Sequence, residues 1–229
     1  MLHDVVMCVA APAFVASPWD GQLRGLRAEG FYGHDRRLLH TARLLIHGRE
    51  PEPIGVQPLG PDRVRFTSVH RYQGDPSDDP TLIVERVRTA GQGEFIQLRN
   101  VGTVTRRLRL ELAPATDLAD IADVTRGRPT PTVPCSVPGD GGGLRWRTQT
   151  GRAEVRTVGG AGAPEVTDGP EGGTFAWPRI MLRPGEDWHT RVGVARAGPG
   201  RPRRGGRWSR PRRSTCGSTA SGTTTVPSP

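Results

Sequence analysis

Charged side chains that could bind a sugar or an ion are concentrated in two short segments, and the first is residues 30–39, GFYGHDRRLL. This segment places Asp35 directly before Arg36 and Arg37. Carboxylate and guanidinium groups can hydrogen-bond sugar hydroxyls, but they also form ion pairs that fix a turn or hold a neighbouring domain. We favour the ion pair, because a charge cluster does not by itself make a binding site.

The second segment, residues 114–127 (PATDLADIADVTRG), repeats aspartate every third residue at Asp117, Asp120 and Asp123. It carries a helix-start signal, with Thr116 or Asp117 as the expected N-cap. On such a helix the carboxylates could hold a cation or line a carbohydrate groove. A calcium site requires a loop that offers more oxygen ligands. We therefore expect a solvated or domain-facing stripe, with Asp117 near the positive end of the helix.

Histidines and cysteines give no metal or disulfide pattern. No two histidines are spaced H-x-x-x-H, and His40 and His47 flank one expected strand at a separation that places them on opposite faces. The 3 cysteines are never spaced C-x-x-C, so we expect reduced thiols, a cytoplasmic location, no metal and no cofactor. Some tryptophans could stack on a sugar, but core positions are commoner for such residues. The tryptophans in question are Trp146, Trp177 and Trp188.

These side chains must be positioned by strands, because apolar and polar residues alternate with a period of two along much of the chain. Turn signals follow at Asp20-Gly21, 91–93 (Gly-Gln-Gly), Gly151 and Pro184-Gly185, and we expect each to connect two strands of a hairpin. The pattern predicts a mostly antiparallel β-sandwich over residues 1–195 with one or two short helices. The clearest expected strands are Thr41–His47, Arg63–Tyr72, Leu82–Arg88, Phe95–Arg99 and Arg106–Leu112, and a polar loop is expected at Asp75–Pro80.

Residues 196–229 differ in composition from the rest. They hold eight arginines and no acidic residue, which leaves 32 − 8 = 24 basic against 23 acidic residues before them. Their large apolar side chains are only Trp208 and Val226, so we expect a disordered tail. The Arg/Pro/Gly/Ser/Thr composition is also what a GC-rich gene yields when it is read out of frame, and we consider this tail a frameshift product.

Membrane insertion and export are not expected. No apolar run is long enough to span a bilayer. The apolar residues 5–16 are preceded by Met1-Leu2-His3-Asp4, which carries no Arg or Lys, so they do not form a secretory signal.

Three segments, in this order, resemble the N-terminal domain of bacterial glycogen-debranching (amylo-α-1,6-glucosidase) proteins. The first is 19–21 (Trp-Asp-Gly) followed by 30–39, the second is 44–48 (LLIHG), and the third is 115–127 (ATDLADIADVTRG). Each motif is weak alone, and three in register are more specific. His40 stands where the family usually has serine, and Ala122-Asp123 replaces the more usual Phe-Glu.

The resemblance implies a sandwich that packs on an (α/α) toroid, which holds the carboxylates that cleave α-1,6 branch linkages. We expect the toroid to be missing from this chain, and no pair of its carboxylates can be assigned to the acid and base or nucleophile roles that glycoside cleavage requires. The expected function is thus a non-catalytic domain that shapes the toroid's cleft, with α-glucan as a further partner. Candidate binding or domain-interface residues are Asp35, Arg37, Asp117, Asp120 and Arg126.

Two alternatives stay open. The chain could be a stand-alone carbohydrate-binding or interaction module. It could also bind nucleic acid through the arginines of its tail, although the near-neutral charge of residues 1–195 argues against a nucleic-acid partner.

Overall fold

The structure is a computed structural model, and it describes residues 5–72 and 79–196. All of these residues fall within the first of two units of the chain, Met1–Gly198. Most of the loop expected at Asp75–Pro80, and all but the first residue of the expected tail 196–229, lie outside the described residues.

The described residues form seventeen strands and one helix, which confirms the mostly β fold class. In chain order they are β1 (Val5–Ala10), β2 (Ala13–Pro18), β3 (Leu23–Arg24), β4 (Gly30–Gly33), β5 (Arg36–Leu39), β6 (Thr41–Ile46), β7 (Glu52–Gly60), β8 (Arg63–His70), β9 (Leu82–Thr89), β10 (Gly93–Asn100), β11 (Arg106–Ala115), α1 (Ile121–Thr125), β12 (Cys135–Ser136), β13 (Gly143–Arg147), β14 (Arg152–Gly160), β15 (Glu165–Thr167), β16 (Thr174–Leu182) and β17 (Asp187–Ala195). Within these residues no helix has the length and apolar character needed to span a membrane.

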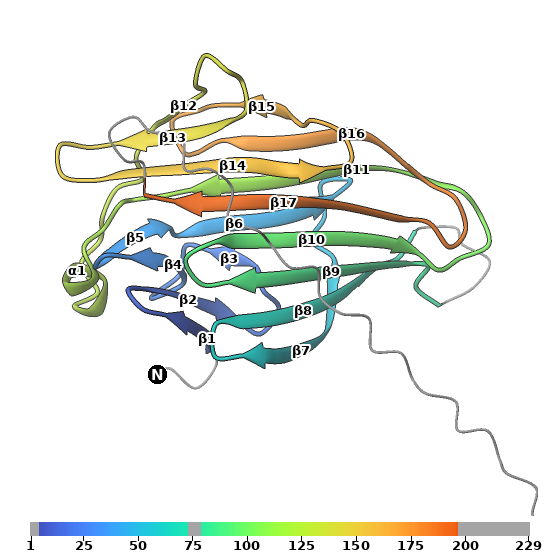
Figure 1. Cartoon of the computed structure of the whole chain (residues 1–229), viewed down its shortest axis with the longest axis horizontal. Helices are drawn as coiled ribbons and strands as arrows, with labels where there is room; N and C mark the ends of the chain where they lie inside the picture. Colours follow the sequence, from blue (N-terminus) through green and yellow to red (C-terminus); the bar gives the residue numbers. More distant parts are fainter. Residues whose placement is uncertain (1–4, 73–78, 197–229) are drawn as a thin grey trace, which may run out of the picture. The chain divides into compact units, whose positions relative to one another are not determined.

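The strands form three antiparallel sheets (Figure 1). The largest has eight strands in the order β12-β13-β14-β17-β10-β9-β8-β7, the second has five in the order β15-β16-β11-β6-β3, and the smallest is β1-β2-β4-β5. In the eight-stranded sheet, β17 is the last strand in the sequence yet lies between β14 and β10. It therefore joins the β12–β14 strands to the β7–β10 strands.

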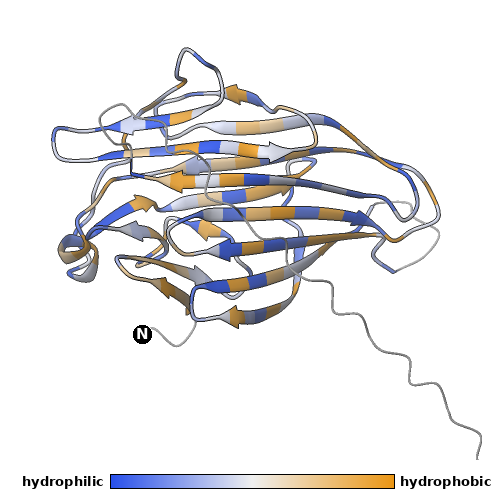
Figure 2. Ribbon diagram, in the orientation of Figure 1, coloured by the Kyte–Doolittle hydropathy of each residue, from blue (hydrophilic) through white to orange (hydrophobic). Residues whose placement is uncertain are grey.

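The sequence alternation explains which side chains enter the core. On β11, Leu108, Leu110 and Leu112 are buried while Arg107 and Arg109 are exposed. Figure 2 shows the same alternation of hydrophobic and hydrophilic residues along other strands. Because successive side chains of a strand point to opposite faces, β11 turns one apolar face into the core.

The five-stranded and eight-stranded sheets pack against each other, as a sandwich requires. Trp177 on β16 and Trp188 on β17 meet edge to face with 5.5 Å between ring centroids. A guanidinium of Arg86 on β9 donates a 3.4 Å hydrogen bond to the backbone carbonyl of Ala42 on β6. One apolar cluster contains buried residues of both sheets.

Two of the expected hairpins are wrong. Strand β2 pairs with β4, whereas Leu23 of β3 pairs with Ala42, so Asp20-Gly21 carries the chain from one sheet to another. Gly21 is required by packing, because a Cβ there would lie 2.7 Å from the Phe66 ring. Similarly, β16 and β17, on either side of Pro184-Gly185, belong to different sheets. The turns at 91–93 and Gly151 do connect paired strands, β9 with β10 and β13 with β14.

Candidate functional site

The two charged segments identified in the sequence lie side by side. The backbone N–H of Arg37 donates to the carbonyl of Ala119 at 2.9 Å, and that of His40 donates to Ala115 at 3.1 Å. In the other direction, the N–H of Ile121 donates to the carbonyl of Asp35 at 2.9 Å. Segments about eighty residues apart in sequence thus run antiparallel and form one junction.

The centre of this junction is a buried ion pair between Arg37 and Asp117. The Arg37 Nε donates to Asp117 Oδ1 at 3.1 Å, and its Nη2 binds the other carboxylate oxygen. Its Nη1 also donates to the backbone carbonyl of Arg27 at 2.8 Å. Although burial alone would lower it, the pKa of Arg37 is raised because Asp117 stabilises the cation. The pair ties the β4–β5 hairpin to the end of β11.

Asp35 is not the partner of Arg37. It is exposed at the turn between β4 and β5, where His34 and Asp35 have φ angles of 51° and 61°. Such left-handed backbone is typical of tight hairpin turns. Asp35 contributes its backbone carbonyl to the junction and leaves its carboxylate facing solvent.

The expected stripe of three aspartates on one helix is wrong. Helix α1 begins at Ile121, and its N-cap is Asp120, whose carboxylate accepts a 2.9 Å hydrogen bond from the N–H of Ala122. Asp117 lies before the helix, because Leu118 adopts a φ of 49° through which a helix cannot continue. The side chain of Asp117 is buried. Asp123 is on the helix and pairs with Arg128. Arg126 is the C-cap, and its side chain is exposed.

An open groove of about 630 Å³ lies beside the junction. Its floor includes Arg24, Thr41 and Ala115, which are register partners across β3, β6 and β11. Burial lowers the pKa of His40, with Arg37 contributing and Asp117 opposing, so this histidine is neutral at pH 7. The lining residues are Arg24, His40, Thr41, Arg43, Ala115, Thr132, Pro170 and Glu171.

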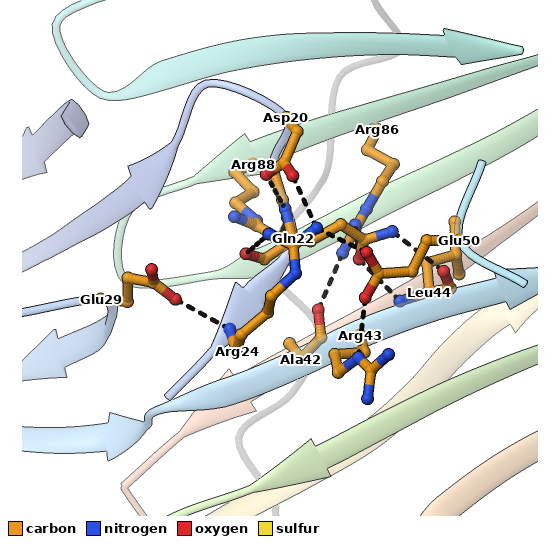
Figure 3. Close-up of polar contacts among 11 residues, drawn as sticks. Asp20, Gln22, Arg24, Glu29, Ala42, Arg43, Leu44, Glu50, Arg86 and Arg88 are labelled. Carbon is orange, nitrogen blue, oxygen red and sulfur yellow. Dashed lines mark hydrogen bonds and ion pairs between the residues drawn. The ribbon is translucent and has the colours of Figure 1, made fainter. Parts of the chain in front are cut away.

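Arg24 and Arg43, which line the groove, belong to a row of alternating charges that also includes Asp20 and Glu50 (Figure 3). Arg24 Nη2 lies 2.7 Å from Asp20 Oδ2 and also contacts Glu50, whose other oxygen accepts from Arg43 Nε at 2.7 Å. Burial would raise the pKa of Glu50, but the two arginines hold it below the usual value. Each charge in the row is therefore neutralised by its neighbours.

Behind this row lies a cluster of fully buried charges, Arg86, Arg88 and Glu94. Glu94 accepts from Arg86 at 2.8 and 3.0 Å and from Arg88 at 3.1 Å. Burial lowers the pKa of Arg88 to about 10 although Glu94 opposes it, so Arg88 stays charged at neutral pH. Its guanidinium also lies over the rings of Phe31 and Phe66. The cluster carries two positive charges and one negative charge in the core.

The buried cluster holds the turn that carries Asp20. Arg88 donates to Ser17 Oγ at 2.7 Å and binds the carbonyl of Gly21, and Arg86 donates to Gln22 Oε1 at 2.9 Å. Figure 3 shows Gln22 between the surface row and the buried arginines. Sequence reasoning did not identify this cluster, although the alternation of β9 already placed Arg86 and Arg88 on the same side as two core residues.

The groove contains polar groups for binding but offers one carboxylate, Glu171, among its eight lining residues. Glycoside cleavage requires an acid and a base or nucleophile on opposite sides of the bond. Among the described residues, no group of three or more His, Cys, Asp or Glu is arranged to hold a metal. The lining can therefore donate and accept hydrogen bonds but lacks a pair of opposed carboxylates.

The tryptophans considered for sugar stacking are core residues. Trp146, Trp177 and Trp188 are 1%, 3% and 6% exposed. Trp19, directly before Asp20, is 52% exposed. Trp19 follows a strand in the sequence and does not belong to a stretch of alternating apolar and polar residues. Sequence periodicity therefore does not identify it as a candidate.

Comparison with known proteins assigns the chain to a family. Residues 9–193 match the family model described as the N-terminal domain of (some) glycogen debranching enzymes. No curated protein matches the chain significantly. The matched range contains the junction, the charge row and the buried cluster. The chain therefore belongs to the family of N-terminal domains of glycogen debranching enzymes.

Proposed function

We propose that this chain is a non-catalytic domain of α-glucan metabolism that packs on an (α/α) toroid catalytic domain and shapes one wall of its cleft. The observation that carries the proposal is the family match over residues 9–193, whose description is that of an N-terminal domain of debranching enzymes. A cytoplasmic location is part of the proposal, and the free thiols of Cys8 and Cys135 support it.

The junction offers a surface suited to a neighbouring domain. Asp35 and Arg126 are exposed on it, while their backbones are fixed by hydrogen bonds to Ile121 and Ala122. The Arg37–Asp117 pair and the Asp120 cap hold this backbone from within. Exposed charges on a rigid backbone can pair with a partner at little cost in conformational entropy.

The test mixes the full chain with the toroid domain of a debranching enzyme from the same organism. Sedimentation velocity measures complex formation, and glucose release from a branched limit dextrin measures activity. We expect a complex, higher activity of the toroid in the mixture, and no release by the chain alone. The Asp35→Ala/Arg126→Ala variant should weaken the complex, whereas Arg63→Ala, an exposed arginine of β8, should not. A toroid that neither binds the chain nor responds to it would contradict the proposal.

A second candidate is a stand-alone carbohydrate-binding module, and the open groove is the observation that favours it. Nucleic-acid binding through the tail rests on residues outside the described part of the chain.

A further inference from the structure

We infer that the outward face of the eight-stranded sheet, across strands β8, β9, β10, β17, β14 and β13, docks an acidic surface of another protein. We call this surface the arginine face. The inference goes beyond the proposed function, because it concerns neither the junction nor the groove and requires neither a toroid nor a glucan. It rests on the way charge is distributed over residues 1–195.

The arginine face has a large excess of positive charge. Side chains of these six strands alternate between the core and the outside, so the burial pattern identifies the outward positions. The outward positions carry eight arginines and three acidic residues, a net charge of 8 − 3 = +5. The rest of residues 1–195 holds 24 − 8 = 16 arginines and 23 − 3 = 20 acidic residues, a net charge of −4. The arginines are Arg63, Arg65, Arg99, Arg145, Arg147, Arg152, Arg156 and Arg191, and the acidic residues are Glu85, Glu154 and Asp187.

Two arginines of this face have no partner among the described residues. Arg147 and Arg152 are register partners on β13 and β14, so their side chains leave the sheet next to each other. Neither side chain forms an ion pair or a hydrogen bond within residues 5–72 and 79–196, whereas Arg145 and Arg156 share Glu154. Like charges directly opposite each other destabilise a sheet. A carboxylate supplied by a partner would remove this repulsion.

The middle of the arginine face is aromatic. The guanidinium of Arg191 on β17 lies over the ring of Phe95 on β10, 5.5 Å from its centroid. The His189 ring lies 5.7 Å from the same ring, measured between centroids. Val158, towards the end of β14, is 45% exposed. Arginine and aromatic residues are enriched at protein–protein interfaces, so this composition fits a protein partner.

The charge pattern favours an acidic protein over a phosphate polymer or an anionic membrane. Glu85, Glu154 and Asp187 lie among the arginines and would repel a uniformly charged ligand. A protein surface can instead place a positive or polar group opposite each of them. Residues 196–229 hold eight arginines and no acidic residue, so charge does not favour this segment of the chain as the occupant.

The size of the arginine face indicates a transient complex. Six neighbouring strands about 4.8 Å apart, read along the outward stretch from Ile83 to Thr89, give about 24 Å by 20 Å, or about 500 Å². A stable complex buries about 800 Å² on each partner, and transient complexes bury less. Because the contacts are charged and exposed, their strength should fall as the salt concentration rises.

Titration of the full chain with poly-L-glutamate at low ionic strength tests the inference, with chemical-shift mapping of the backbone amides. We expect saturable, salt-sensitive binding that shifts the amides of the six strands. Arg147→Glu/Arg152→Glu should weaken binding about tenfold, because it reverses the two unpaired charges. The milder Arg147→Gln/Arg152→Gln removes the like-charge repulsion, so it should fold at least as well and still weaken binding.

The matched control is Arg107→Glu/Arg179→Glu, at two exposed arginines of the five-stranded sheet. It changes the net charge by the same amount and keeps the same tail, so binding should weaken by less than about threefold. Thermal unfolding by circular dichroism verifies that each variant is folded.

Four results would overturn the inference. Polyglutamate does not bind, or the face variant and the control lose binding equally. At equal concentration of negative charge, polyuridylate or phosphatidylglycerol vesicles bind this face more tightly than polyglutamate does. Sedimentation velocity of the chain alone shows self-association that Arg147→Glu/Arg152→Glu abolishes, which would make the occupant a second copy. The titration contains no toroid and no glucan, so its outcome does not depend on the proposed function.

Discussion

Replacing Glu94 by glutamine would leave two buried arginines without a negatively charged partner. Arg86, Arg88 and Glu94 are 1%, 0% and 3% exposed, so water cannot compensate for the lost charge. The amide keeps the shape of the side chain but places N–H groups where a guanidinium needs an acceptor. Removing one partner of a buried ion pair typically costs about 3–5 kcal/mol. That is a large share of the roughly 5–15 kcal/mol stability of a domain.

The magnitude can be judged against a second variant in the same cluster, Arg86→Met. This change removes one of the two cations and leaves Arg88 paired with Glu94. Gln22 Oε1, which loses Arg86, still accepts from the N–H of Leu44 at 2.8 Å. We therefore expect a cost of about 1–2 kcal/mol from lost hydrogen bonds. Glu94→Gln should cost more than Arg86→Met because the cluster has a net positive charge. Replacing Glu94 increases that net charge, whereas replacing Arg86 removes it.

Urea unfolding at pH 7.5, followed by tryptophan fluorescence, measures both variants. Glu85→Gln is the matched control on β9, because its side chain is 36% exposed and its ion pair with Arg65 is long, at 3.9 Å. It should change the free energy of unfolding by no more than about 0.5 kcal/mol. If Glu94→Gln proves no more destabilising than Arg86→Met, the reasoning from the uncompensated charge is refuted. If Glu94→Gln does not fold, Arg86→Met in the same chain should partly restore folding.

Three further predictions concern the fold and the junction. Gly93→Ala should prevent β10 from pairing with β17, because its Cβ would lie 2.1 Å from the carbonyl of Val192 at a φ of 130°, and amide exchange of β17 would rise. Asp117→Asn should lower the free energy of unfolding by about 3 kcal/mol or more in urea titrations, since it leaves the buried Arg37 unpaired; an effect below about 1 kcal/mol would count against the pair. The pKa of His40 is lowered in the folded state, mainly by burial, so its contribution to stability is complete above the unfolded pKa of 6.5 and is lost as the pH falls below it. Wild type should thus lose more stability than His40→Gln between pH 7 and pH 5, by at most about 1.4 kcal/mol per pH unit, and equal losses would contradict this account.

The sequence predicted strands well and sheet membership poorly. The alternation of β9 and β11 identifies their buried faces directly, because side-chain direction is a local property of a strand. The same alternation cannot say which sheet a strand joins. The turn signals at Asp20-Gly21 and Pro184-Gly185 predict hairpins, whereas the chain crosses between sheets there. The residue types of a turn are compatible both with a hairpin and with a crossover between two sheets.

The site was also predictable only in part, because sequence patterns identify local motifs but not contacts between distant residues. Both segments of the junction were visible as motifs, yet the partner of Arg37 was not, since Asp117 lies eighty residues further along the chain. The groove gave no signal, because Arg24, Thr132 and Glu171 come from separate parts of the sequence and none belongs to a motif. Only the fold brings them together.

The position of β17 has a consequence for the order in which the protein is made. Strand β10 can pair with β9 as soon as residue 100 has been synthesised. Its other edge stays unpaired until residues 187–195 have been synthesised. During that interval an unpaired edge is open to another chain, which is a known route to aggregation. We expect nascent chains that stop before Asp187 to depend on chaperones far more than those that reach Ala195.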